Sequence, residues 1–496
     1  MSSNDVWGGC IWRRMASRLR LHITSVGSRD TVPDPASYNI GARLPGCHRW
    51  GRGASLDSPP ELPASPSPGA RSDRPSPGRR TPRAALVAAG LLAALVVFIQ
   101  GGWFLVVATD PDPLDAAYRD WIQFHRTGER VIAGAYDQIY PGDFVDDGRP
   151  EFDDGLYFMY PPFVAWVTVP LGFLPPLGAY AACVLLVVAA TVAATLACLR
   201  IFRVDGERRM FAVLGTVASA PWNAAVILGH LSATLVVPPV LALMAWRAAR
   251  PFRSGAALGL LLAKPNWGLP MLLLLAVGRR WRMLAGALVA GLALVVVSLP
   301  FGVEVWSDWW RTMVGYRALI TDGTQPWRQA TLFASLQSLL GRTGSDGLVV
   351  ALWVAFGGTL FAGALGAWAL RGRETPMIPR LIGVALLAVV ATNPYAHFYD
   401  ALLPLPAALM LWAAPETWHD PSLLRWARVA LGVTWLWMPL QYLVWMATAP
   451  SLAGVGFSAW LAVEVADLWR GARAARRRGP GPTGGPRAVS GPPLSA

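Results

Sequence analysis

Residues 84–108, AALVAAGLLAALVVFIQGGWFLVVA, decide the fold class of this chain. These 25 residues include no ionisable side chain. A helix that rises about 1.5 Å per residue over this length crosses a hydrocarbon core of roughly 30 Å. The whole chain has the same character, since 54% of its 496 residues are hydrophobic and only 15% are charged. Because soluble globular domains carry more charge, the sequence predicts an all-α polytopic membrane protein.

The net charge of +13 predicts the orientation of the chain. Arginines gather in the tails and in short connections between apolar runs, a pattern typical of cytoplasmic segments beside a lipid bilayer and not of nucleic-acid binding. The 13 arginines before residue 84 predict a cytoplasmic N-terminus and an outer location for the next loop. Residues 1–83 and 471–496 are too polar and too rich in Pro and Gly to fold, so we expect disordered basic cytoplasmic tails on either side of a transmembrane domain at 84–470.

Nine further apolar runs, together with the first, predict about ten crossings, an even number that returns the C-terminus to the cytoplasm. Two other runs, 161–176 and 255–277, are interrupted by prolines or by Lys264. They would carry arginines outward if each crossed fully, so we predict re-entrant or broken helices there, with a tilted single span as the alternative for the second. The further predicted crossings are 177–201, 211–228, 232–249, 281–299, 347–370, 380–396, 399–414, 424–446 and 451–469.

The predicted outer loop at 109–160 holds 12 of the chain's 30 acidic residues and only four arginines. Within it, residues 120–134 carry apolar side chains at helical spacing and predict an amphipathic helix along the membrane surface. Asp120 lies at the start of this helix, where spacing alone leaves it as an N-cap or as a catalytic group. The carboxylates from Asp143 to Asp154 predict a solvated loop, with a divalent metal site as the alternative.

Polar residues within apolar surroundings mark candidate binding positions. Lys264 lies inside an apolar run, where a lysine costs at least about 2.5 kcal/mol on insertion scales. Its amine either snorkels to the interface or contacts an anionic lipid phosphate. His397, Tyr399 and Asp400 form a polar cluster at a predicted outer helix junction, more than a simple turn requires. His230, in a short outer turn, is either a satisfied interface histidine or a ligand.

Several motifs follow one another along the chain: Asp120-Trp121 with Gly134, Ala-Tyr-Asp-Gln-Ile-Tyr at 135–140, Tyr160-Pro-Pro-Phe, Pro170-Leu-Gly-Phe-Leu-Pro, Leu228-Gly-His-Leu-Ser232, Ala263-Lys-Pro265, Trp306 with Trp309-Trp310, and Asn393-Pro-Tyr-Ala-His-Phe-Tyr-Asp400. Their order and spacing resemble glycosyltransferase family 87 across residues 84–415. This family contains GT-C-type membrane enzymes, including actinobacterial α-mannosyltransferases that use polyprenol-phosphate-mannose. Two departures concern the substrates: His230 stands where the family usually has Gln, and the first outer loop is unusually long and acidic.

The resemblance implies roles for individual residues. Asp120 takes the place of the family's loop carboxylate, the general base for the acceptor hydroxyl, with Asp115 and Asp112 as alternatives. A cation offsets the charge of the departing lipid phosphate, and Lys264, Arg317 or Arg328 supplies it. No metal ligand is assigned. The expected substrate-binding residues are Tyr160, His230, Lys264, His397, Tyr399 and Asp400.

The predicted function is therefore transfer of a sugar, mannose by resemblance, from a polyprenyl-phosphate donor to a lipid or glycan acceptor at the outer face of a bacterial plasma membrane. A divalent metal is the one cofactor for which the sequence offers a candidate site. A transporter or lipid flippase is the alternative, and it predicts internal symmetry and mid-membrane charges that the apolar runs, apart from Lys264, almost entirely lack. A membrane scaffold without catalytic activity is a third possibility.

Overall fold

The computed structural model describes residues 83–109, 120–140, 158–321, 330–340, 346–444 and 452–477. Several sequence predictions lie outside these residues, namely the N-terminal tail before Arg83, the alternative bases Asp112 and Asp115, the carboxylates at 143–154, and the cation Arg328. The predicted start of the C-terminal tail at residue 471 is too early, because residues 471–477 continue the last helix.

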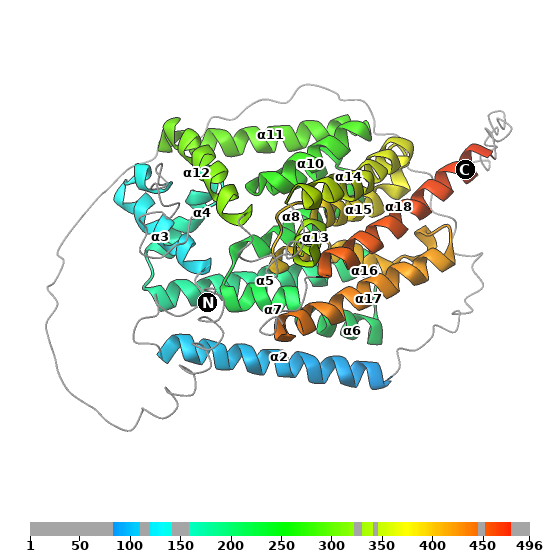
Figure 1. Ribbon diagram of the computed structural model, residues 1–496, viewed down its shortest axis with the longest axis horizontal. Helices are drawn as coiled ribbons and strands as arrows, with labels where there is room; N and C mark the ends of the chain where they lie inside the picture. The colour runs from blue at the N-terminus through cyan, green and yellow to red at the C-terminus, as the bar shows by residue number, and fades with distance from the viewer. Residues whose placement is uncertain are drawn as a thin grey trace, which may run out of the picture. The chain divides into compact units, whose positions relative to one another are not determined.

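Every regular element in the described part of the chain is a helix (Figure 1). The α-helices are α2 (Arg83–Thr109), α3 (Asp120–Ala133), α4 (Ala165–Gly172), α5 (Pro176–Ile201), α6 (Gly206–Val217), α7 (Ala220–Leu228), α8 (Val237–Arg247), α9 (Pro251–Gly259), α10 (Pro265–Val277), α11 (Trp281–Ser298), α12 (Glu304–Thr321), α13 (Leu332–Leu340), α14 (Asp346–Arg371), α15 (Ile378–Thr392), α16 (Leu405–Ala413), α17 (Pro421–Val444) and α18 (Ala453–Arg477). The 3₁₀ helices are η1 (Tyr136–Gln138), η2 (Pro162–Val164), η3 (Leu231–Val236), η4 (Leu260–Ala263), η5 (Leu299–Phe301), η7 (Thr375–Met377), η8 (Phe398–Leu402) and η9 (Pro415–Thr417).

Five of these helices are long and apolar enough to cross a membrane, and α6 with α7 adds a sixth if this pair, bent by 48°, is one span. The predicted crossings at 232–249 and 399–414 are instead shorter apolar helices. Helices α17 and α18 coincide with the last two predicted crossings but do not combine sufficient length with sufficient apolar character. The predicted total of about ten crossings is therefore not reached by this criterion. The five spans are Leu86–Thr109, Pro176–Ile201, Trp281–Phe301, Gly347–Arg371 and Thr375–Thr392.

The chain between α8 and α11 forms a helical hairpin, which confirms the broken helix predicted at 255–277. Helices α9 and α11 touch at Gly255 and Gly286, where a Cβ would collide with the backbone of the facing helix. Small residues allow such close contact between helices. Because α9 and α11 begin side by side, α10 must run back to the end where α9 started. Lys264 forms the closed end of this first hairpin, and its extended backbone is the conformation favoured before Pro265.

Helices α15 and α16 form a second hairpin. Arg380, in the first turn of α15, donates from Nη1 to the carbonyl oxygen of Thr417 beyond α16 at 2.8 Å, so the open ends lie together. The closed ends of the two hairpins also meet. Asn266 Nδ2 donates to the carbonyl oxygen of Tyr395 at 3.1 Å, and Asn393 Nδ2 donates to the carbonyl oxygen of Asn266 at 3.3 Å. The polar motifs at these closed ends therefore become neighbours.

Helix α3 confirms the helix predicted at 120–134, but its surroundings differ from the prediction. It packs on α4 through Gly128 and Gly172, where the two backbones leave no room for a Cβ. The side chains of Trp121 and Phe124 on its apolar face are buried. This face packs against α4 and α5, so protein covers the surface that was expected to lie on the membrane.

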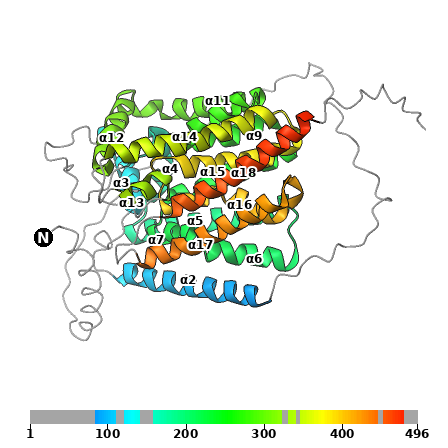
Figure 2. The same cartoon turned by 45° about the vertical axis from the view of Figure 1, so that its right-hand side comes forward.

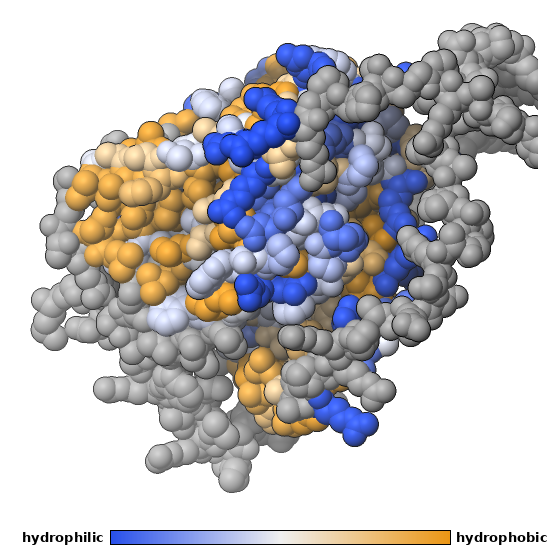
Figure 3. Space-filling model, turned by 90° about the vertical axis from the view of Figure 1, so that its right-hand side faces the viewer, coloured by the Kyte–Doolittle hydropathy of each residue, from blue (hydrophilic) through white to orange (hydrophobic). Residues whose placement is uncertain are grey.

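The described helices have two distinct ends. Figures 1 and 2 show α3 and α12 at one end, and the beginning of α2 and the end of α18 at the other. Arginine-rich connections meet at the second end, where Arg247 donates to the carbonyl oxygen of Ile201 and Arg280 to that of Gly372. Figure 3 looks at this arginine-rich end, and hydrophilic residues gather there with apolar surface to the sides.

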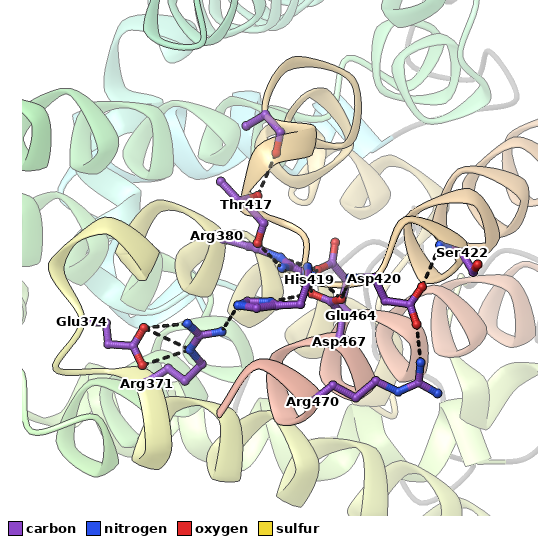
Figure 4. A network of polar contacts seen from close by, with 11 residues as sticks. Arg371, Glu374, Arg380, Thr417, His419, Asp420, Ser422, Glu464, Asp467 and Arg470 are labelled. Atoms are coloured by element: carbon purple, nitrogen blue, oxygen red, sulfur yellow. Dashed lines mark hydrogen bonds and ion pairs between the residues drawn. The ribbon is translucent and has the colours of Figure 1, made fainter. Parts of the chain in front are cut away.

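A buried polar network holds α18 against α15 (Figure 4). Arg380 donates to Glu464 at 2.8 Å and to Asp467 at 2.7 Å, and all three side chains are buried. Asp467 also accepts the backbone N–H groups of His419 and Asp420. Sequence reasoning missed this network, because Arg380 and Glu464 are 84 positions apart.

Candidate active site

Five segments converge where the closed ends of the two hairpins meet. Helix α3 contributes Asp120, and the segment before α4 contributes Tyr160. The turn between α7 and η3 contributes His230, and the first hairpin contributes Lys264. The second hairpin contributes Asp400 and its neighbours. The predicted site residues that the structure describes came from several separate motifs, and each of these motifs contributes to this one cluster.

Lys264 and Asp400 form a buried ion pair. The Nζ atom of Lys264 lies 2.7 Å from Oδ1 of Asp400, and the side chains are 13% and 1% exposed. Ser232 Oγ lies 3.2 Å from the same carboxylate oxygen, and the backbone N–H of His397 donates to Oδ2 at 3.0 Å. Both carboxylate oxygens are therefore satisfied, as a buried charge requires. The Lys264 amine turns into the protein and does not snorkel.

Aromatic rings surround the Lys264 amine. Its Nζ atom lies 4.6 Å from the ring centroid of Trp267, 5.4 Å from that of Tyr399 and 5.7 Å from that of Tyr160. Such positions favour a cation. Burial raises the pKa of Tyr160 well above the usual value, and the charges of Asp400 and Asp120 raise it further. Tyr160 is therefore a neutral hydrogen-bonding group. Trp267 was not predicted, although its place three positions after Lys264 was a signal.

His230 lies between the ion pair and Asp120. Its Nδ1 atom accepts the backbone N–H of Ser232 at 3.2 Å, and its ring stacks on Tyr399 with centroids 3.9 Å apart. The Nε2 atom faces the Tyr160 hydroxyl at 3.4 Å and Oδ2 of Asp120 at 4.0 Å. Burial lowers the pKa of His230, and the charges of neighbouring basic groups lower it further. The imidazole is therefore neutral and satisfied at both nitrogens.

Asp120 is the first residue of α3, where the helix dipole favours an ionised carboxylate. Its side chain is 23% exposed, so it is the accessible member of the pair that it forms with buried His230. It lies beside the polar cluster and does not point away from it, as a cap in a solvated loop would.

His397 lies at the edge of the cluster. Its Nε2 atom is 2.6 Å from the Tyr395 hydroxyl, and its ring centroid is 5.1 Å from that of Tyr399. Sequence reasoning had not singled out Tyr395 or the contact that Ser232 makes with Asp400. The contact of Ser232 with Asp400 joins residues 168 positions apart, so local spacing could not predict it.

The structure does not describe the side chains of Arg317 and Arg328, the two arginines predicted as alternative cations. The backbone of Arg317 lies in α12, but its side chain is outside the described part, as is the whole of Arg328. Among the described residues, no group of three or more His, Cys, Asp or Glu could hold a metal ion. The carboxylates at 143–154, for which a metal was the alternative, are not among those residues.

Comparison with known proteins adds a family assignment. Residues 158–392 match the model of glycosyltransferase family 87. The matched region contains Tyr160, His230 and Lys264, whereas Asp120 precedes it and Asp400 follows it. No curated protein and no solved structure matches the chain. Residues 158–392 therefore share the sequence pattern of glycosyltransferase family 87, and this match indicates a membrane glycosyltransferase.

Proposed function

We propose that this protein transfers mannose from a polyprenyl-phosphate donor to a hydroxyl of a lipid or glycan acceptor, at the outer face of a bacterial plasma membrane. One observation carries the proposal: an accessible carboxylate, Asp120, and a buried cation, Lys264, lie on either side of the same neutral imidazole, His230. A base and a cation at one site are the two groups that this transfer needs.

The reaction proposed for this site is a single displacement with inversion. The acceptor oxygen forms a bond to the anomeric carbon as its proton passes to Asp120, and the bond from the anomeric carbon to the phosphate oxygen breaks. Polyprenyl phosphate leaves with one more negative charge than it carried in the donor. It needs no proton from a general acid, but a nearby cation lowers the energy of its developing charge. Asp115 and Asp112 remain the alternative bases.

Lys264 is the cation that we propose for the lipid phosphate. An ammonium group has three N–H donors, and its contact with Asp400 uses one of them. The pair with Asp400 holds the amine in place before the donor binds. Trp267 and Tyr399, whose rings lie against the amine, add an apolar wall beside it.

The arrangement of charge supports the proposed outer location. The loops joined by the Arg247 and Arg280 contacts lie at the arginine-rich end, which the positive-inside rule assigns to the cytoplasm. The first hairpin opens toward that end, and its arm from 251 to 263 is about 20 Å long at the usual helical rise. We therefore propose a GT-C-like arrangement of about ten crossings with both termini cytoplasmic, in which Lys264 lies in the outer part of the membrane.

A donor comparison tests the function. Membranes containing the protein and an acceptor-lipid extract are incubated with radiolabelled mannose, carried either by polyprenyl phosphate or by a nucleoside diphosphate. We expect labelled product from the polyprenyl-phosphate donor alone. Product from the nucleotide sugar alone would contradict the proposal. Movement of the labelled lipid across the membrane without covalent transfer would favour the flippase alternative.

A compensated variant separates a catalytic Lys264 from a structural one. Lys264→Met leaves the Asp400 carboxylate buried and unpaired, a change that destabilises a protein by about 3–5 kcal/mol. Lys264→Met with Asp400→Asn removes both charges and should recover most of that stability. Transfer by the double variant should nevertheless remain about 10²–10³-fold below wild type, because the cation at the phosphate is missing. Thermal unfolding in detergent measures the stability, and initial rates measure the transfer. If the double variant recovered both wild-type stability and wild-type transfer, the role of Lys264 would be purely structural.

A further inference from the structure

His230 links the two charged parts of the candidate site. On one side, its Nε2 atom is 4.0 Å from Oδ2 of Asp120. On the other side, its Nδ1 atom lies 2.8 Å from Oγ of Ser232, which in turn is 3.2 Å from Oδ1 of Asp400. A histidine in such a place could carry protons from Asp120 toward Asp400, or it could only hold the base in position.

The backbone of Ser232 distinguishes these two roles. A peptide N–H can only donate a hydrogen bond, and the N–H of Ser232 points at Nδ1 of His230 at 3.2 Å. Nδ1 must therefore be the acceptor, so the single proton of the neutral ring is on Nε2. In this tautomer the Ser232 hydroxyl, 2.8 Å from Nδ1, directs its one proton to Nδ1, and Lys264 satisfies Oδ1 of Asp400. This atom faces Asp120 and Tyr160. An Nε2 that already carries a proton cannot accept another from a carboxylic acid.

Protonation at the other nitrogen is disfavoured as well. A second proton on Nδ1 would face the backbone N–H that now donates to it. The His230 side chain is 4% exposed, and burial lowers the pKa of the imidazole, as do the charges of nearby Lys264 and His397. The face that stacks on Tyr399 offers the ring no water. His230 therefore remains neutral with one fixed tautomer.

We infer that His230 is a positioning residue, a fixed neutral hydrogen-bond donor that holds the Asp120 carboxylate ionised and oriented, and that it does not relay protons. This inference rests on the proposed role of Asp120 as the base. The present separation of 4.0 Å is longer than a hydrogen bond, and contacts of catalytic groups commonly tighten when substrate binds. The proton that Asp120 takes from the acceptor then leaves to water on the exposed side of Asp120.

Two amide substitutions separate the two nitrogens of His230. His230→Gln places an amide near the position of Nε2 and keeps a donor for Asp120. His230→Asn reaches only as far as Nδ1, so it can satisfy Ser232 but not Asp120. Both amides are neutral and smaller than or similar in size to imidazole, and thermal unfolding in detergent should show comparable folding. His230→Leu, with no polar atom, is the control for loss of both contacts.

The pH dependence of kcat/KM is the decisive measurement, because its acidic limb reports the pKa of the base in the free enzyme. The base must be ionised, and the loss of a donor to a carboxylate raises its pKa. We therefore expect the Asn and Leu variants to shift the limb upward by about one pH unit and to lower kcat by about 10–100-fold. We expect the Gln variant to keep the limb in place and the rate within about threefold of wild type.

Three outcomes would overturn the inference. A Gln variant as slow as the Leu variant would require the imidazole itself. A wild-type limb that disappears in the Gln variant would mean that His230 titrates and relays protons. Equal limbs in all variants would make its role only structural. Failure of the proposed function looks different, since Asp120→Asn would then retain wild-type transfer whatever residue stands at position 230.

Discussion

Asp120→Asn is expected to lower kcat/KM for sugar transfer by about 10²–10⁴-fold, the usual contribution of a general base. The amide has nearly the shape of the carboxylate but cannot take a proton at neutral pH. It can still contact His230, so the fold should be unchanged. Initial rates with purified protein in detergent or nanodiscs, together with thermal unfolding, check both expectations.

The matched control for this prediction lies on the same helix. Glu129 is a carboxylate of α3 whose side chain is 55% exposed and contacts His125 at 3.4 Å. Glu129→Gln removes the same charge from α3 and should leave transfer within about twofold of wild type. If Asp120→Asn were as active as Glu129→Gln, the base would be another group, and Asp115 and Asp112 would be the next to test.

Arg380→Met is expected to lower the free energy of unfolding by about 3–5 kcal/mol. Glu464 and Asp467 would be left buried with like charges and no cation between them. Their desolvation is no longer offset, so α18 should separate from α15. Thermal or denaturant-induced unfolding in detergent measures the change.

An exposed ion pair of α18 gives the comparison for Arg380→Met. Arg470 contacts Asp420, but its side chain is 61% exposed, so Arg470→Met should cost less than about 1 kcal/mol. Adding Glu464→Met and Asp467→Asn to Arg380→Met removes the unpaired charges and should restore most of the lost stability. A single Arg380→Met variant as stable as Arg470→Met would contradict the role given to the buried network.

Some of the site could be predicted from local sequence alone. Lys264 stood out because inserting a lysine into the membrane within an apolar run costs free energy. The cluster at His397–Asp400 stood out because three ionisable groups lie beside apolar segments predicted to cross the membrane. The partner of Lys264 could not be predicted, since Asp400 is 136 positions away. Only the meeting of two hairpins makes an ion pair of two residues that sequence reasoning had treated separately.

Some features of the helices could likewise be predicted from local sequence, and others could not. Long apolar runs such as α2 and α5 were predicted within a few residues, because hydropathy is a sum over neighbouring residues. The short arms α9 and α10 were predicted as broken, because Pro265 and the flanking arginines are local signals. The network of Arg380 was not predicted, because Glu464 and Asp467 lie in a helix whose charges suggested nothing about their partner.

The sequence by itself determined that this chain is an apolar, all-helical membrane protein, where its long spans lie, and which polar residues stand out as candidates, because each depends on residues close together in the chain. Only the tertiary structure decided that Lys264 pairs with Asp400, that the Ser232 backbone selects the tautomer of His230, and that this imidazole faces Asp120. Those contacts depend on how the hairpins and α3 pack, and packing joins residues that no local pattern connects.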